Sequence, residues 1–248
     1  MHLEPWQWVV CALGAIGLGL SKTGIPGLGI LAVAVFAIAI PSRESVGVVL
    51  PILLVGDIVA VSFYRRHAVW SHLVRLFPAA AVGVVIGWWA LGRMSDAAVA
   101  RVIGVLLIVL VALQMVKMWA DAKRSSNAEP KVHPIVAPVM GVFGGFATMV
   151  ANAAGPIMVL YLLAAGLPKM EFIGTGAWYF LIMNAFKVPF SIRLGLINST
   201  SLPIDALLAP AVIAGAVFGR WVLHHIDQRL FERTAVVLTL IAAVKLLF

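Results

Sequence analysis

Charged residues are scarce in this chain of 248 residues. Asp, Glu, Lys and Arg make up 11% of it, against about 25% in soluble domains, and 62% of the residues are hydrophobic. So few charges cannot cover a water-facing surface, and the composition predicts a polytopic membrane protein. The net charge of +8 does not indicate a nucleic-acid partner, because the basic residues lie in short loops between apolar runs.

Cysteine is almost absent as well. The single cysteine, Cys11, excludes a disulfide within the chain and any metal site built from a cysteine cluster. The histidines do not lie at ligand spacing with acidic residues, and we find no phosphate-binding glycine loop, no zinc-protease motif and no paired intramembrane acids. The sequence therefore predicts no metal, no cofactor and no enzyme active site.

Long apolar runs are what the chain has in abundance. They fall at 6–20, 25–40, 45–63, 72–92, 98–118, 134–150, 154–166, 172–190, 203–223 and 230–247. A full membrane span needs about 20 residues. Four of the runs are shorter and form two adjacent pairs, each joined by a Gly/Pro/polar break: 6–20 with 25–40, and 134–150 with 154–166. We expect each pair to form a short helical hairpin, either re-entrant or fully spanning.

The two halves of the chain resemble each other. A shift of 127 residues aligns Gly17 with Gly144, Glu44 with Glu171, Gly47 with Gly174, Asp57 with Asn184 and Arg66 with Arg193. A shift of 132 aligns Gly83 with Gly215, Gly87 with Gly219, Trp89 with Trp221 and Arg101 with Arg233. Repeats with short, Gly/Pro-interrupted segments are typical of secondary transporters. The sequence predicts an all-α protein of two repeats, 1–119 and 134–248, each with one short hairpin and about three full spans.

Loop charges predict how the repeats cross the membrane. A polar segment divides the halves and is interpreted as a linker, residues 120–133. If each short pair turns back on itself, eleven Lys and Arg residues lie on the side of the linker and five on the other. The bias shrinks if each pair is one broken span. The positive-inside rule therefore places the linker in the cytoplasm and both termini outside it, and an odd number of crossings per half makes the repeats inverted.

Two lysines lie inside apolar runs beside residues that interrupt helices. Lys22 precedes the break at 24–27, and Lys187 precedes Pro189. A charge at bilayer depth costs a few kcal/mol or more and usually serves a function. Two buried cations without a nearby excess of acids predict an anion site. Either lysine could instead extend to the membrane interface, and Lys22 could pair with Asp57.

Polar residues and glycines near these lysines complete the candidate site. Asp57 is the clear intramembrane acid, interpreted either as neutralising Lys22 or as carrying a coupling proton. The glycines either expose backbone N–H groups at helix starts to a ligand or only allow close helix packing. The predicted substrate-binding residues are Ser21, Lys22, Thr23, Gly24, Gly27, Thr148, Asn152, Gly155, Asn184 and Lys187.

Three motifs mark the chain further: Gly17-Leu-Gly-Leu-Ser-Lys-Thr-Gly-Ile-Pro-Gly-Leu-Gly29, the stretch 141–156 and the stretch 174–189. They resemble the TauE/SafE family of sulfite and organosulfonate exporters, and the resemblance covers nearly the whole chain. It implies proton-linked or gradient-driven movement of small sulfur anions across the bacterial inner membrane. Many family members have glycine runs where Ser21-Lys22-Thr23-Gly24 stands here, so the added cation bears on which anion is preferred.

The residues predict a multi-pass secondary transporter of anions that works by alternating access. The resemblance implies that it is an exporter and that its substrates are small sulfur anions such as sulfite or organosulfonates. Its partners would be the anion and the lipid bilayer, with no nucleic acid. A passive anion channel and, further off, a membrane-embedded enzyme stay open as alternatives. The natural anion, the direction of transport, the coupling ion and the formation of a homo-oligomer are left open by the sequence.

Overall fold

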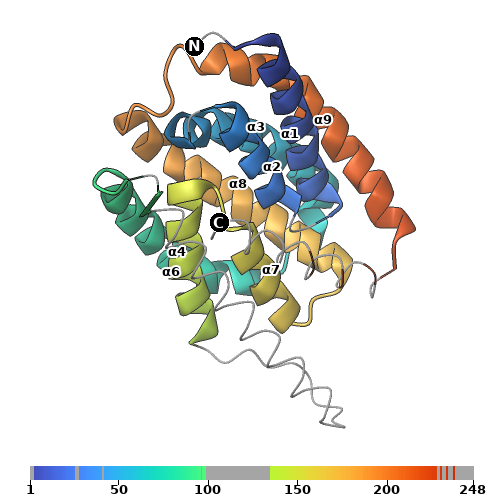
Figure 1. Ribbon diagram of the computed structural model, residues 1–248. Helices are drawn as coiled ribbons and strands as arrows, with labels where there is room; N and C mark the ends of the chain where they lie inside the picture. Colours follow the sequence, from blue (N-terminus) through green and yellow to red (C-terminus); the bar gives the residue numbers. More distant parts are fainter. Residues whose placement is uncertain are drawn as a thin grey trace.

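The computed structural model describes residues 3–25, 28–40, 42–95, 97–98 and 135–227 and the single positions 230, 233 and 237. These residues form helices and no strand, so the predicted all-α fold is confirmed. The predicted linker at 120–133, the apolar run at 98–118 after its first residue, and most of the run at 230–247 lie outside the described residues. The α-helices (Figure 1) are α1 Pro5–Thr23, α2 Leu28–Ala39, α3 Ser42–Tyr64, α4 Trp70–Leu91, α6 Val136–Ala151, α7 Gly155–Ala164, α8 Lys169–Arg193 and α9 Leu202–His225, with a 3-10 turn at Arg65–His67.

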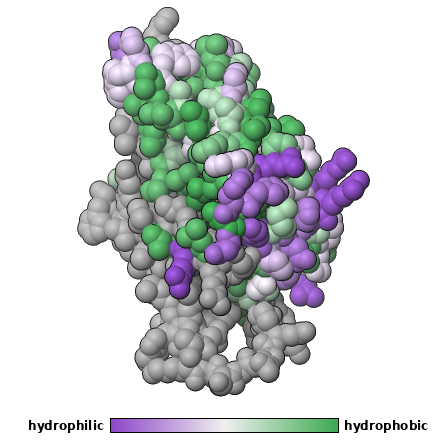
Figure 2. Space-filling model, turned by 90° about the vertical axis from the view of Figure 1, so that its right-hand side faces the viewer, coloured by the Kyte–Doolittle hydropathy of each residue, from purple (hydrophilic) through white to green (hydrophobic). Residues whose placement is uncertain are grey.

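Three of the described helical segments are long and apolar enough to cross a membrane: Glu44–His67, Trp70–Leu91 and Leu202–His225. The helices α1 and α8 have comparable lengths of 19 and 25 residues but are less apolar, since they hold polar groups that include Lys22 and Lys187. Large hydrophobic side chains are exposed along α4 and α9, among them the repeat partners Trp89 and Trp221 at 57% and 56%. Figure 2, which views the molecule from the side of α9, shows hydrophobic residues gathered over much of this face and a hydrophilic patch beside them. An apolar exposed surface of this kind suits lipid contact.

Helices of the two halves pack against each other in a reciprocal way. The first helix of the first half, α1, lies along α9, and the first helix of the second half, α6, lies along α4 (Figure 1). Glycine allows both approaches: a Cβ at Gly215 would collide with the carbonyl oxygen of Ile16, and a Cβ at Gly83 would collide with that of Val142. Gly83 and Gly215 are the positions that align at the shift of 132. Aligned glycines thus make corresponding contacts.

A second aligned pair of glycines behaves in the same way. Gly47 on α3 abuts the carbonyl group of Leu196, just after α8, and Gly174 on α8 abuts the backbone of His67, just after α3. The helix α3 therefore contacts the turn after α8, and α8 contacts the turn after α3. The two helices also pack against each other inside the molecule (Figure 1). These glycines serve close packing. The orientation of the two halves across a membrane stays a prediction.

The breaks after α1 and α6 differ in detail from the sequence-based expectation. The helix α1 continues past the apolar run at 6–20 to Thr23, so Lys22 lies in its last turn, directly before the break. The helix α6 ends at Ala151, and Asn152 follows in the left-handed conformation with φ 52° and ψ 29°. Asparagine tolerates this conformation better than most residues with a side chain. The turn at Asn152 lets α7 begin at Gly155, only four residues after the end of α6.

Candidate functional site

The ammonium group of Lys22 is held inside the protein. Its Nζ lies 2.6 Å from Oδ1 of Asp57 on α3, whose side chain is 0% exposed, while that of Lys22 is 9% exposed. The same Nζ lies 4.2 Å from the ring centroid of Phe180 on α8, a cation–π distance. Of the interpretations open for Lys22, the structure shows the pair with Asp57. Because α1 continues to Thr23, Lys22 lies in its last turn, where its side chain contacts both α3 and α8.

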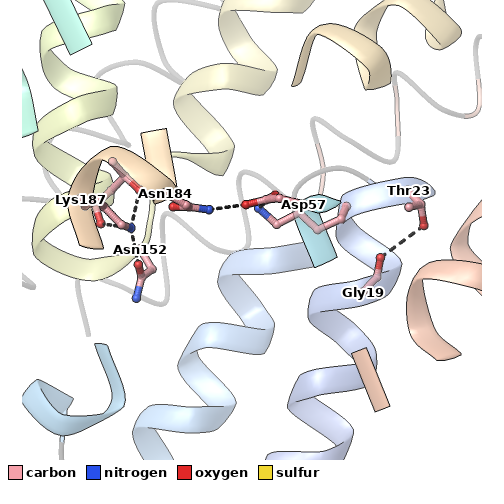
Figure 3. Close-up of polar contacts among 8 residues, drawn as sticks. Gly19, Thr23, Asp57, Asn152, Asn184 and Lys187 are labelled. Atoms are coloured by element: carbon pink, nitrogen blue, oxygen red, sulfur yellow. Dashed lines mark hydrogen bonds and ion pairs between the residues drawn. The ribbon is translucent and has the colours of Figure 1, made fainter. Parts of the chain in front are cut away.

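The carboxylate of Asp57 also joins the two halves of the chain. Asn184 on α8 donates a hydrogen bond of 2.6 Å from Nδ2 to Oδ2 of Asp57 (Figure 3). These two residues align at the shift of 127, so equivalent positions of α3 and α8 meet. The amide oxygen of Asn184, Oδ1, is buried and has no hydrogen-bond partner in the part of the chain that the structure describes.

Lys187 is more deeply buried, at 1% exposure, and does not reach an interface. Its Nζ donates to the carbonyl oxygen of Thr148 at 2.9 Å, to the hydroxyl oxygen of Thr148 at 2.9 Å and to Oδ1 of Asn152 at 2.5 Å (Figure 3). An ammonium group has three N–H donors, and all three find an acceptor here. The acceptors lie at the C-terminal end of α6, where a helix favours a cation. They are all neutral, so these hydrogen bonds do not compensate the charge of Lys187.

A cavity of about 70 Å³ opens beside these groups. One water molecule needs about 10–15 Å³, so the cavity can hold a larger group. Its polar side chains are Ser21, Lys22, Thr148, Asn152 and Asn184. The remaining lining residues are three glycines and ten residues without a polar side-chain group: Gly29, Gly155, Gly176, Leu18, Val33, Leu53, Met158, Val159, Leu162, Phe172, Ile173, Ala177 and Phe180.

Backbone also reaches the cavity, at the start of α7. A Cβ added to Gly155 would meet no atom within 4 Å, so open space lies directly beside this residue. The N-terminal N–H groups of a helix, with the positive end of its dipole, favour a negatively charged ligand. The preceding turn is fixed by Asn152, whose Nδ2 donates to the carbonyl oxygen of Val46 on α3 at 3.0 Å. Asn152 thus links α3, Lys187 and the break between α6 and α7.

The structure brings six of the predicted site residues together around this cavity: Ser21, Lys22, Thr148, Asn152, Gly155 and Asn184. Asp57 and Lys187 are buried and bonded directly to members of this group. Thr23 and Gly24 do not line the cavity and instead contact α9. The hydroxyl of Thr23 donates to the carbonyl oxygen of Ala216 on α9 at 2.6 Å, and a Cβ at Gly24 would collide with the carbonyl group of Gly219. The remaining one, Gly27, lies outside the described residues.

Sequence reasoning missed the aromatic part of the site. Phe180 contacts Lys22 and lines the cavity, and Gly29 and Gly176 line it as well. A signal for Phe180 was present, because it precedes Asn184 by four residues and so shares a face of α8 with it. Among the described residues, no three His, Cys, Asp or Glu side chains are grouped so as to hold a metal ion.

The helices and this interior site define a helical membrane protein with a charged, partly polar cavity. The chain belongs to a family whose description is Sulfite exporter TauE/SafE, since the sequence model of that family matches residues 10–246. The resemblance drawn from the motifs is thereby confirmed, and the family is one of membrane transporters. Comparison with curated proteins gave no match, and comparison with solved structures gave none.

Proposed function

We propose that this protein is a secondary transporter that moves small sulfur-containing anions, such as sulfite or organosulfonates, across the bacterial inner membrane. Family membership supports the transporter class and the sulfur anions. The family description supports export as the direction of transport. The repeat pattern supports a mechanism of alternating access, in which the two halves move relative to each other. The cavity supplies a place for the anion beside the buried Lys22 and Asp57.

One observation supports an anionic substrate above all: the formal charges around the cavity do not balance. Lys22 is paired with Asp57, but Lys187 has only neutral acceptors. Among the described residues of this group, two ammonium groups therefore face one carboxylate. A buried charge without a counterion is costly. An anion beside Lys22 and Asn184 would offset this excess of positive charge, which is one unit while Asp57 is ionised and two units when Asp57 is protonated.

The polar lining suits an oxyanion. Lys22 would supply charge, while Ser21, Thr148, Asn152 and Asn184 would supply hydrogen bonds, together with the N–H groups at the start of α7. Lys187 would hold Thr148 and Asn152 in position from behind. No single group needs to move far for a sulfonate or sulfite oxygen to reach the Lys22 ammonium, since that group already lines the cavity.

Asp57 would couple the anion to a proton. An anion that binds Lys22 competes with the carboxylate 2.6 Å away. Protonation of Asp57 would remove this competition and release Lys22 to the anion. The adjacent Asn184 can serve both states, because its amide offers N–H donors to a carboxylate and a carbonyl acceptor to a carboxylic acid. One proton would then accompany each anion.

Counterflow in proteoliposomes tests the function. Vesicles loaded with unlabelled sulfite should accumulate external radiolabelled sulfite transiently when they contain the wild-type protein, whereas a simple channel gives no such overshoot. Lys22→Met keeps the length of the side chain and removes the charge, and we expect uptake at least about tenfold slower, the equivalent of ~1.4 kcal/mol. Unchanged uptake by Lys22→Met at low sulfite, or uptake without any overshoot, would contradict the proposal.

A further inference from the structure

The lining of the cavity changes in character along α8. Six residues of this helix face the cavity, and only the last carries a polar side chain: Phe172, Ile173, Gly176, Ala177, Phe180 and Asn184. Twelve residues separate Phe172 from Asn184, which is about 18 Å of helix. Asn184 is bonded to Asp57 and thereby lies next to Lys22. The charged end of the cavity is therefore the end at Asn184.

The lining of α7 changes in the same direction. Gly155 begins this helix next to Asn152 and Thr148, at the polar end, and the cavity-lining residues that follow it are Met158, Val159 and Leu162. Leu162 belongs to the apolar end, because a Cβ added to Gly176 would lie 3.9 Å from its Cδ1. Two helices thus agree that the cavity has one cationic, hydrogen-bonding end and one apolar end.

We propose that this cavity takes an organic sulfonate with a short apolar body and binds it more tightly than it binds sulfite. The inference rests on the proposed function and concerns the substrate class of the same site. Sulfite would occupy the polar end alone and leave the side chains around Gly176 facing water or empty space. An alkanesulfonate would place its sulfonate beside Lys22 and Asn184 and its methylene groups against Leu162, Ile173 and Ala177.

The proposal predicts a dependence on chain length. Each methylene group moved from water into the apolar end is worth about a fourfold gain in affinity, the equivalent of ~0.8 kcal/mol. The gain should stop once the apolar end is filled. The charge should remain essential at every length, because the sulfonate still needs Lys22.

Two glycines provide matched variants, one at each end of the cavity. A Cβ at Gly176 meets only Leu162, in ordinary contact, so Gly176→Val fills space at the apolar end. A Cβ at Gly155 meets nothing within 4 Å, so Gly155→Ala narrows the polar end. We expect Gly176→Val to remove the gain with chain length and to weaken propanesulfonate binding much more than it weakens sulfite binding. We expect Gly155→Ala to weaken sulfite and all sulfonates alike.

The experiment is a titration of the purified full-length protein with sodium sulfite, methanesulfonate, propanesulfonate and pentanesulfonate by calorimetry. The expected result for the wild type is a dissociation constant about 15-fold lower for propanesulfonate than for methanesulfonate, as two further methylenes are buried. Pentyltrimethylammonium, which has the same tail and the opposite charge, should not bind. Lys22→Met should lose all four anions.

Each outcome decides one of the two claims. Sulfite binding as tight as that of every sulfonate would overturn the preference for an apolar body and leave the transporter in place. A chain-length gain that persists in Gly176→Val, or binding of pentyltrimethylammonium, would also overturn it, because the tail would then bind elsewhere. No binding of any sulfur anion would overturn the proposed function itself. If Gly176→Val does not fold, the wild-type series alone still tests the preference for an apolar body.

Discussion

Asn184 donates a hydrogen bond of 2.6 Å to the carboxylate of Asp57, although 127 residues separate them along the chain. Both side chains are buried, at 1% and 0% exposure. The separation equals the shift that aligns the two halves, so the contact joins equivalent positions of α3 and α8. The equivalent residues are an acid in one half and an amide in the other. The two halves are therefore chemically unequal where they meet, and Lys22 pairs with the acid.

The pair of Lys22 and Asp57 should be strongly coupled in stability. Asp57→Asn leaves a buried ammonium group without its counterion, and we expect a loss of about 3–5 kcal/mol in the free energy of unfolding. The double variant Lys22→Met with Asp57→Asn should recover a large part of that loss. Chemical denaturation of the two single variants and the double variant in a double-mutant cycle measures the coupling. Additive losses would show that the pair contributes no coupling energy.

Transport should depend on pH through Asp57. If protonation of this carboxyl frees Lys22 for the anion, uptake at low substrate should rise as the pH falls. Asp57→Asn carries no titrating group at this position, so its uptake should vary less with pH. Initial rates between pH 5 and 8 with a constant concentration of the anionic substrate check this. If Asp57→Asn shows the same pH profile as the wild type, Asp57 does not carry the coupling proton.

Lys187 should influence anion binding without touching the anion, because it holds Thr148 and Asn152 in position and supplies the excess positive charge of the group. Lys187→Met leaves Oδ1 of Asn152 and the Thr148 hydroxyl without their common donor, at a cost of about 1–3 kcal/mol for each unsatisfied buried group. We expect a lower melting temperature and weaker anion binding, with a residual affinity that Lys22→Met lacks. Thermal unfolding and calorimetry on both variants separate the two roles. Equal loss of binding in both variants would place Lys187 beside Lys22 as a direct anion contact.

The aligned glycines at the helix contacts should be intolerant of a methyl group. Gly83→Ala and Gly215→Ala would each push a Cβ into a backbone carbonyl of a neighbouring helix, and we expect each to lose about 1–3 kcal/mol. Gly176→Ala is the matched control, since it is also helical and its Cβ meets one side-chain atom at 3.9 Å. Denaturation midpoints in detergent compare the three. A loss in the control as large as in the other two would point to a general effect of glycine replacement.

The linker predicted at 120–133 should face the cytoplasm. Cys11 is buried and can be replaced by serine to give a cysteine-free background. A cysteine introduced as Ser126→Cys should then react with a membrane-impermeant maleimide only in inside-out vesicles. Labelling in intact spheroplasts would contradict the interpretation of the loop charges.

Much of the fold followed from the sequence alone. Eight of the ten apolar runs coincide with described helices. Burial in lipid requires backbone hydrogen bonds within each segment, and helices meet that need locally. The motifs also indicated the family. Lys22 and Lys187 marked the region of the site, because a charged residue inside an apolar run can be recognised from the sequence alone.

Only the tertiary structure decided which of these groups meet. Lys22 belongs to the end of α1, paired with Asp57 and covered by Phe180, while Thr23, one residue later, points to α9. Neighbouring residues on a helix point in different directions, and their partners lie on helices far away in sequence. The cavity with its charged and apolar ends arises from the packing of α1, α2, α3, α6, α7 and α8, which no single segment encodes.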